Sequence, residues 1–185
     1  MATVHTDVIS LCEQKAIEYF YPHYKFKGRK PRIKHVKQMA TDGVMSVSGL
    51  LERVILDNNQ KLKRSHKKGE DYHDGSDAKY ATARLKQCNS YTKKDGTVQK
   101  VMRCLTEVTN LKNKKGRLRV FINYYNPDRD LYKPYMFSIP YSVWSKCLNK
   151  KGNILFSFAS DTTLAGKTAE RYGKYQVYSI KELAA

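Results

Sequence analysis

Two amphipathic segments open the chain, and apolar runs at strand spacing follow them. Within residues 6–20, apolar side chains recur every three or four positions, as one face of a helix requires, and Pro22 closes the segment. A second helical stripe runs from residue 49 to about residue 63, with residues 46–48 as its capping region. The pattern therefore predicts two helices before the first strand.

The rest of the chain is dominated by short β-type patterns. The predicted strands cover residues 80–85, 101–108, 118–125, 135–139, 154–159 and 174–180, and residues 140–148 are predicted to form a short helix. Helices followed by a run of strands indicate an α/β (α+β) fold, and 185 residues without a linker suit a single domain, residues 1–185. Its expected parts are N-terminal helices with a basic segment (1–65), a sheet core (about 66–148) and C-terminal strands (149–185).

Positive charge changes this picture from a generic domain to a binder of polyanions. The chain has 35 Lys and Arg against 17 Asp and Glu, a net charge of +18, and nucleic acid is the usual partner of such a surface. Within residues 24–37, Gly28 and Pro31 favour a loop over a helix. We expect phosphate contacts from this basic segment and from residues 110–119: Lys25, Lys27, Arg29, Lys30, Arg32 and Lys34 in the first, and Lys112, Lys114, Lys115 and Arg117 in the second. The alternative is that these segments are solvated charged loops.

Cysteine usage and hydropathy limit the compartment and the metal chemistry. The four cysteines lie far apart without a CxxC pair, so we expect reduced side chains and no zinc site. No apolar run reaches membrane-spanning length, and the N-terminus lacks a secretory pattern. The expectation is a cytoplasmic protein of a bacterial or virus-infected cell with no membrane association.

The acidic stretch at residues 70–79 stands out in this basic chain. Its Asp74-Gly75 pair is typical of a tight hairpin turn, because Gly tolerates a positive φ. Side chains alternate along a strand, so Asp77 and Lys79 share one face, and the incoming arm of the hairpin would bring Asp71 to them. Carboxylates repel the phosphates of DNA unless a cation lies between them. We therefore expect a divalent metal here, Mg²⁺ or Mn²⁺, held by oxygen ligands.

Two other motifs in the sequence each lack a residue that they require. Residues 166–168 read Gly-Lys-Thr, but the position where a phosphate loop needs its first glycine is Asp161, so the segment is expected to be a loop. His73 and Asn89 resemble the start of a His-Asn-His nuclease motif, but no histidine follows Asn89. Glu107 is expected to be an exposed strand residue.

The acids and the lysine at residues 71–79 resemble the PD-(D/E)XK phosphodiesterase signature of restriction enzymes, repair nucleases and some phage endonucleases. In that family an acid is followed across a turn by an acid-x-lysine triplet, which here would be Asp77-Ala78-Lys79 after the leading acid Asp71. The family often adds an acid from the preceding helix, and Glu52 matches it. The residue before Asp71 is Glu70 instead of the family's proline, and Asp74 remains an alternative leading acid.

The resemblance implies a mixed central sheet flanked by helices, as in restriction endonucleases, and a Mg²⁺-dependent endonuclease acting on double-stranded DNA. Asp71, Asp77 and Glu52 would hold the metal, and Lys79 would orient or deprotonate the attacking water. The small type II restriction enzymes that the chain resembles typically act as homodimers on palindromic targets, so the resemblance implies a homodimer. It equally allows a nuclease carried by a phage or virus. The alternative from another class is a non-catalytic basic nucleic-acid-binding protein.

Overall fold

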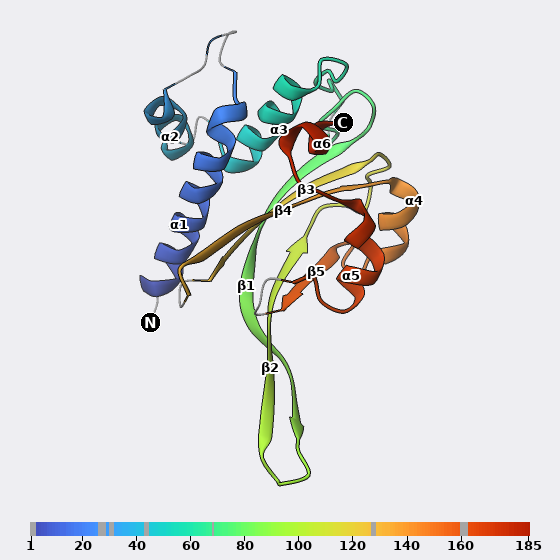
Figure 1. Ribbon diagram of the computed structural model, residues 1–185. Helices are drawn as coiled ribbons and strands as arrows, with labels where there is room; N and C mark the ends of the chain where they lie inside the picture. Colours follow the sequence, from blue (N-terminus) through green and yellow to red (C-terminus); the bar gives the residue numbers. More distant parts are fainter. Residues whose placement is uncertain are drawn as a thin grey trace.

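The computed structural model describes residues 3–25, 29, 32–42, 45–67, 69–126, 129–159 and 163–185, with the side chains of 3–10, 41, 84–89 and 100–103 left out. Its centre is a six-stranded sheet with the strand order β5-β2-β1-β3-β4-β6 (Figure 1). The strands are β1 Asp77–Thr92, β2 Val98–Val108, β3 Leu118–Asn126, β4 Leu131–Ile139, β5 Ile154–Ala159 and β6 Gln176–Val177. Strands β1 and β3 pair in parallel and all the other pairs are antiparallel, which confirms a mixed sheet.

Helices flank this sheet on both sides (Figure 1). They are α1 Thr3–Phe20, α2 Ile33–Thr41, α3 Val47–Asn58, α4 Tyr141–Trp144, α5 Lys167–Tyr172 and α6 Ile180–Ala184, with 3₁₀ turns at Tyr21–His23, Ser145–Cys147 and Gly173–Tyr175. Three helices precede four consecutive strands, and helices and strands alternate only from α4 onward, so the α/β (α+β) class predicted from the hydrophobic pattern is confirmed.

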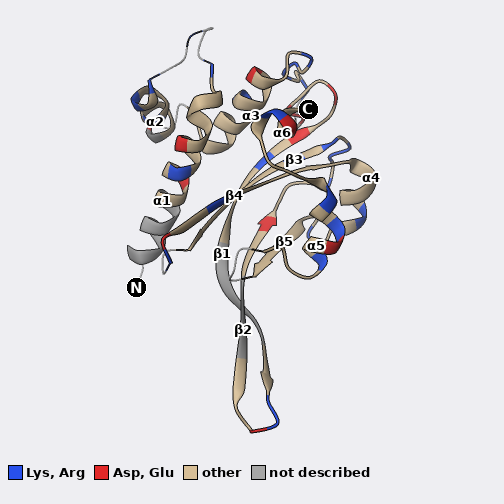
Figure 2. Cartoon of the chain, in the orientation of Figure 1, with Lys and Arg blue, Asp and Glu red and all other residues tan. Residues whose placement is uncertain are grey.

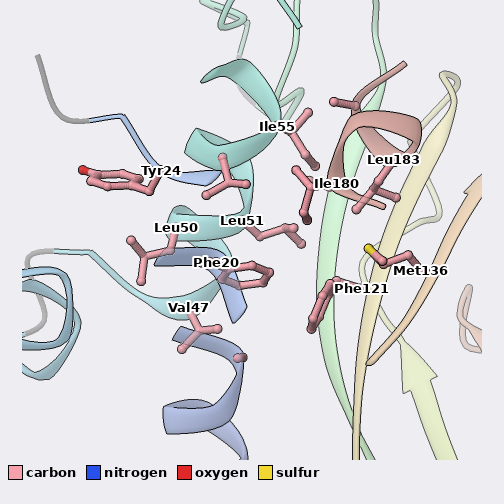
Figure 3. Close-up of a cluster of buried hydrophobic side chains, with 14 of the residues drawn as sticks. Phe20, Tyr24, Val47, Leu50, Leu51, Ile55, Phe121, Met136, Ile180 and Leu183 are labelled. Carbon is pink, nitrogen blue, oxygen red and sulfur yellow. The ribbon is translucent and has the colours of Figure 1, made fainter. Parts of the chain in front are cut away.

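One face of the sheet is covered by α1, α3 and α6, whose apolar stripes meet the strands in a continuous core (Figure 3). Phe121 of β3 lies at its centre, with the Phe20 ring 4.7 Å away between centroids in an edge-to-face contact. Leu51 and Ile180 are fully buried between the same layers. This packing fixes α3, and with it Glu52, against the start of β1.

The opposite face carries a second core around the aromatic side chains of β3, β4 and β5. Alternate residues of β3, including Val120 and Ile122, point into it, as the two-residue period of a strand requires. Trp144 of α4 and Tyr172 of α5 close this core from outside. By the same alternation, Asp77 and Lys79 lie on this face, whereas Ala78 belongs to the first core.

Several expected boundaries require correction. Residues 33–37, expected in a loop, begin helix α2, because the breakers Gly28 and Pro31 lie before the helix and leave it uninterrupted. Residues 167–168, expected in a loop, lie in α5. The final predicted strand, 174–180, is reduced to two residues of β6, followed by α6, since Ser179 and Glu182 form a capping box that starts a helix.

The expected helix at 49–63 ends early, at Asn58, and the expected strand at 80–85 is part of a much longer one, β1. Asn58 turns its side-chain amide onto the carbonyl oxygens of His23 and Val54, 2.9 and 2.8 Å away. Among the described residues no helix is both long and apolar enough to span a bilayer.

Candidate acid–lysine site

A five-residue turn, Tyr72–Ser76, sets up the candidate site. The Tyr72 amide donates to the Ser76 carbonyl oxygen over 3.2 Å, and the Gly75 amide donates to the Tyr72 carbonyl oxygen over 3.0 Å. Gly75 adopts φ +76°, which a residue without a Cβ does at little cost. The Asp-Gly turn predicted from the sequence is therefore present at the predicted position.

The partner of the incoming arm differs from the expectation. Tyr72 forms an antiparallel bridge with Arg64, and the Ser65 amide donates to the Asp71 carbonyl oxygen over 3.1 Å. The outgoing strand instead pairs with β3, where the Asp77 amide donates to the Arg117 carbonyl oxygen over 2.9 Å. Asp71 thus reaches the start of β1 from a small separate ladder, because the chain before it turns back on residues 63–65.

The loop between β2 and β3 docks tightly against this turn. A Cβ at Gly116 would overlap the Gly75 backbone, so only glycine permits the observed approach. The Trp144 indole holds the loop from the other side, with Nε1 donating to the Gly116 carbonyl oxygen over 3.0 Å. The contact places Lys114, two residues earlier, beside the first residue of β1.

Arg119 anchors the turn to helix α6. It is 2% exposed, and its guanidinium donates to the Ser76 hydroxyl oxygen and, over 3.0 Å through Nε, to the Leu183 carbonyl oxygen. The guanidinium carbon also lies 5.6 Å from the Tyr72 ring centroid, a cation–π contact. A buried arginine with these partners ties α6 to the turn.

Asp77 is the centre of the site. It is 2% exposed, and each of its carboxylate oxygens faces an ammonium group: Oδ1 lies 2.7 Å from Lys114 Nζ and Oδ2 lies 2.7 Å from Lys79 Nζ. The sequence pattern predicted the Lys79 contact. It did not predict Lys114, which lies 37 residues away along the chain and also donates to the Gly69 carbonyl oxygen.

Asp71 completes an acid pair. Its Oδ2 accepts a hydrogen bond from the Ala78 amide over 2.8 Å, and its carboxyl group is within hydrogen-bonding reach of Asp77. Burial, followed by the interaction with Asp77, raises the pKa of Asp71 to about 6. Burial also opposes the ionisation of Asp77, but hydrogen bonds from Asp71 and the two lysines outweigh it and lower its pKa. The pair therefore holds one proton on Asp71 below about pH 6.

Glu52 lies at the edge of the pair. Its charge contributes to the raised pKa of Asp71, yet its nearest cation is Arg64, with Nη2 3.5 Å from Oε2. The Tyr72 hydroxyl group donates to the Glu52 backbone carbonyl oxygen over 3.2 Å and so holds α3 against the turn. Of the four residues predicted for catalysis, Asp71, Asp77 and Lys79 meet at the start of β1, whereas Glu52 acts on Asp71 only through its charge and is not grouped with the two aspartates.

The donor set suits Mg²⁺ better than a metal with a full protein cage. In the described part of the chain, no three His, Cys, Asp or Glu side chains are grouped to hold a metal ion. Mg²⁺, however, keeps several waters and is commonly bound by one or two carboxylates plus substrate phosphate. Asp77 Oδ2 is buried and lies 2.7 Å from Lys79 Nζ, so an ion bound at this oxygen would have to displace that ammonium group. That oxygen and the Asp71 carboxyl group are the donors that such an ion would use.

The rival acids are occupied elsewhere. Asp74 Oδ1 accepts hydrogen bonds from the Ser76 amide, 3.0 Å away, and from the Ser76 hydroxyl group, 2.5 Å away, so Asp74 stabilises the turn. The Nδ1 atom of His73 accepts from the Lys63 amide over 3.0 Å. Glu107 is exposed, and its Oε2 accepts a hydrogen bond from the side-chain Nδ2 of Asn153 over 3.3 Å. The geometry thus favours Asp71 over Asp74 as the leading acid.

The expected phosphate-binding residues separate into different environments. Those on the surface are Lys25, Arg29, Arg32, Lys34, Lys112, Lys115 and Arg117, whereas Lys27 and Lys30 lie outside the described residues. Lys114 differs from the rest, because its side chain is only 14% exposed and points into the acid pair.

A surface hollow of about 940 Å³ lies between α2, α3 and residues 62–64. Its charged lining residues are Lys25, Glu52, Arg53, Asp57, Lys63 and Arg64. Arg53 is paired with Asp57 and Arg64 with Glu52. Glu52 is the one predicted catalytic residue among the described lining residues, so the hollow does not include the Asp71–Asp77 pair.

Comparison of the chain with family models, with curated proteins and with solved structures finds no match. Functional conclusions therefore rest on the site itself.

Proposed function

We propose that this chain is a Mg²⁺-dependent endonuclease that hydrolyses phosphodiester bonds in double-stranded DNA, organised like the PD-(D/E)XK enzymes. The observation that carries the proposal is the pair formed by buried Asp77 and half-buried Asp71, with Lys79 beside it, in a chain of net charge +18. Paired carboxylates inside a polyanion-binding protein oppose its substrate unless they serve a cation. Either Mg²⁺ or Mn²⁺ suits this oxygen donor set. In keeping with the type II restriction enzymes that it resembles, we propose a cytoplasmic homodimer.

Each residue at the start of β1 has a role in this proposal. Asp71 and Asp77 would hold the metal, and Glu52 would act from α3, beside the pair and not as part of one group with it. When bound, Mg²⁺ would supply a water of lowered pKa and positive charge for the transition state. Lys79, already 2.7 Å from Asp77, orients the attacking water and stabilises the negative charge that develops on the phosphoryl oxygens. The attacking water loses a proton to solvent and its oxygen forms the new bond to phosphorus, while the bond from phosphorus to the sugar oxygen breaks and that oxygen takes a proton from solvent.

A specific observation supports a second candidate, a non-catalytic nucleic-acid-binding protein. Both oxygens of Asp77 already face a lysine ammonium at 2.7 Å, so the acid could act as a structural counter-ion that joins β1 to the β2–β3 loop. Under this alternative, Lys79 and Lys114 remain paired with Asp77 when DNA is bound.

Incubation of supercoiled plasmid with the protein, in Mg²⁺ or in EDTA, decides between the two. We expect nicked and linear products only with the metal, and their loss in Asp77→Ala and Lys79→Ala, with binding of DNA largely retained. Glu170→Ala and Lys167→Ala are matched controls, because both residues are exposed on α5 and lie outside the site. Variants at positions 77 and 79 that cut as fast as the wild type would refute the site. No cutting of DNA under Mg²⁺ or Mn²⁺ would leave the binding protein as the function.

A further inference from the structure

A long two-stranded ribbon extends away from the body of the molecule (Figure 1). Strand β1 pairs with β3 only as far as Ala83, and β5 pairs with β2 only from Arg103 onward. Between these points, residues 84–92 pair with residues 98–105, and among the described strands no third one pairs with β2 before Arg103 or with β1 after Ala83. We call residues 84–102, with their turn at 93–97, the ribbon arm.

The arm is exposed along the part whose side chains are described. Every residue from Ser90 to Gln99 is exposed, including Tyr91 at 51% and Val98 at 62%. An isolated two-stranded hairpin is at best marginally stable in water. An exposed ribbon that projects this far is therefore placed to gain contacts from a partner.

Charge identifies the class of that partner. The ribbon arm, residues 84–102, contains Arg84, Lys86, Lys93, Lys94 and Lys100 against a single acid, Asp95. The turn at the tip carries two of these lysines and the acid (Figure 2). Two such arms would repel each other, which argues against a second copy as the occupant, whereas a polyanion is attracted.

Shape narrows the class to duplex DNA. The free part of β1, nine residues from 84 to 92, spans about 30 Å at the usual rise of a strand. The major groove of B-DNA, about 12 Å wide and 8.5 Å deep, admits a two-stranded ribbon, whereas the major groove of A-form RNA is too narrow and deep for side chains to read. The Tyr91 hydroxyl group donates to Gln99 Oε1 over 2.6 Å and so orients a carboxamide, a group that reads base edges in this groove.

We propose that the ribbon arm enters the major groove of duplex DNA and so holds the substrate for the acid site. This inference rests on the proposed function for its biological role, but binding through the arm does not depend on cleavage. The same strand, β1, begins with Asp77 and continues into the arm, so the arm fixes the position of the duplex relative to the acids. A straight strand of sixteen residues spans about 50 Å, or some 15 base pairs.

Binding of a labelled 30-base-pair duplex, followed by fluorescence anisotropy in EDTA, tests the arm. The double variant Lys93→Ala with Lys94→Ala should bind about tenfold more weakly, and the slope of log affinity against log salt should fall by about 2, one phosphate contact per lysine. The charge-matched control combines Lys167→Ala with Lys181→Ala, two exposed lysines on α5 and α6. The control should bind as the wild type does, and thermal melting should show that both variants remain folded.

A photo-crosslink locates the contact independently of affinity. Replacing Tyr91 with p-benzoylphenylalanine should give a covalent adduct with the duplex under ultraviolet light. The same replacement of Tyr178, which is 76% exposed but lies after β6, should give none. A duplex premethylated at guanine N7, in the major groove, should give less adduct at position 91.

The outcomes separate this inference from the proposed function. Three results would overturn the proposal that the arm binds duplex DNA. They are wild-type affinity in the tip variant, no adduct at position 91 in a bound complex, and binding of double-stranded RNA that depends on the tip as strongly as binding of DNA. If the tip variant no longer forms a dimer while its DNA affinity is unchanged, the arm contacts a second copy of the chain, and the proposal is overturned as well. If the arm results hold and no metal supports cleavage, the nuclease proposal fails alone. Failure of the wild type to bind duplex DNA would overturn both.

Discussion

The chain contains the same turn twice, in two very different surroundings. In the first, Asp74 Oδ1 accepts from the Ser76 amide over 3.0 Å; in the second, Asp95 Oδ1 accepts from the Thr97 amide over 2.9 Å. The backbone closes in the same way in both, and the central glycines have φ +76° and +83°. One turn is docked between the β2–β3 loop and Arg119, and the other forms the tip of the ribbon arm.

The difference shows which properties come from the local sequence and which from the packing around it. An Asp-Gly pair followed by Ser or Thr is sufficient for the turn itself, since the hydrogen bonds are made within five residues. The pair of acids at the first turn depends on residues that are distant in the sequence: Lys114 of the docked loop pairs with Asp77, and the charge of Glu52 on α3 contributes to the raised pKa of Asp71. The second turn has no such neighbours among the described residues, and it presents two exposed lysines instead.

The largest effect concerns the carboxylates around the first turn. Under the proposed function, Asp71→Asn should reduce plasmid cleavage by a factor on the order of 10² or more, because it removes a metal ligand. Asp74→Asn should change it less than about threefold, since asparagine keeps the acceptor oxygen that caps the turn. Initial rates of plasmid nicking in Mg²⁺ measure both. Loss of activity in Asp74→Asn with activity retained in Asp71→Asn would exchange their roles.

The second effect comes from a substitution that breaks the contact between the β2–β3 loop and the first turn. Gly116→Ala would place a methyl group inside the Gly75 backbone, and relieving that overlap should cost about 3 kcal/mol of unfolding free energy. A chain of this length should then melt about 6 to 12 °C lower. The control is Gly173→Ala, where the new methyl group meets nothing within 4 Å and φ is −52°. Similar melting temperatures for the two variants would show that the loop can move away without cost.

The third effect depends on pH and belongs to the first turn alone. Burial and Asp77 raise the pKa of Asp71 to about 6, so between about pH 4 and 6 the folded state holds a proton that the unfolded chain releases. The contribution of Asp71 to stability is therefore greatest below pH 4 and falls as the pH rises to 6, by roughly 1 kcal/mol since the group is partly exposed. Asp71→Asn should remove this fall.

Urea unfolding in EDTA at several pH values between 4 and 7 measures the difference between the wild type and Asp71→Asn. The matched control is Asp95→Asn, because hydrogen bonds from Thr97 lower the pKa of Asp95 and it has no neighbouring acid to share a proton. A wild-type curve parallel to that of Asp71→Asn across this interval would show that the two carboxyl groups do not share a proton.

The first turn also shows how far the sequence alone predicts a site. Alternation along a strand was enough to place Asp77 and Lys79 on one face, and the Asp-Gly signal placed the turn itself. Lys114 was predicted as a surface contact for phosphate, because its inward direction depends on the close approach of Gly116 to Gly75, which no local pattern records. The only sequence signal for the inward direction of Lys114 is the glycine within its basic turn, and such glycines are common in loops.

The fold was predictable to a similar depth. Hydrophobic spacing identified α1, α3 and the central strands, whose buried stripes are regular. It did not reveal that β1 continues to Thr92, because the exposed arm buries little and carries no alternating apolar pattern. Helix α2 was missed for the opposite reason: Pro31 suggested a loop, although proline is well tolerated just before a helix.

The smallest effect compares the two turn glycines directly. Gly75→Ala and Gly96→Ala impose the same local strain, about 1 kcal/mol, because each places an L residue at positive φ with open space around the new methyl group. Gly75 lies in a turn docked on the core, so its variant should melt about 2 to 4 °C lower. Gly96 lies at the tip of the arm, where local opening relieves the strain without unfolding the body. Gly96→Ala should therefore leave the melting temperature unchanged and instead speed amide hydrogen exchange at residues 90–99. Equal losses in melting temperature would show that the arm unfolds together with the body, and that the two turns differ less in their coupling to the core than their surroundings indicate.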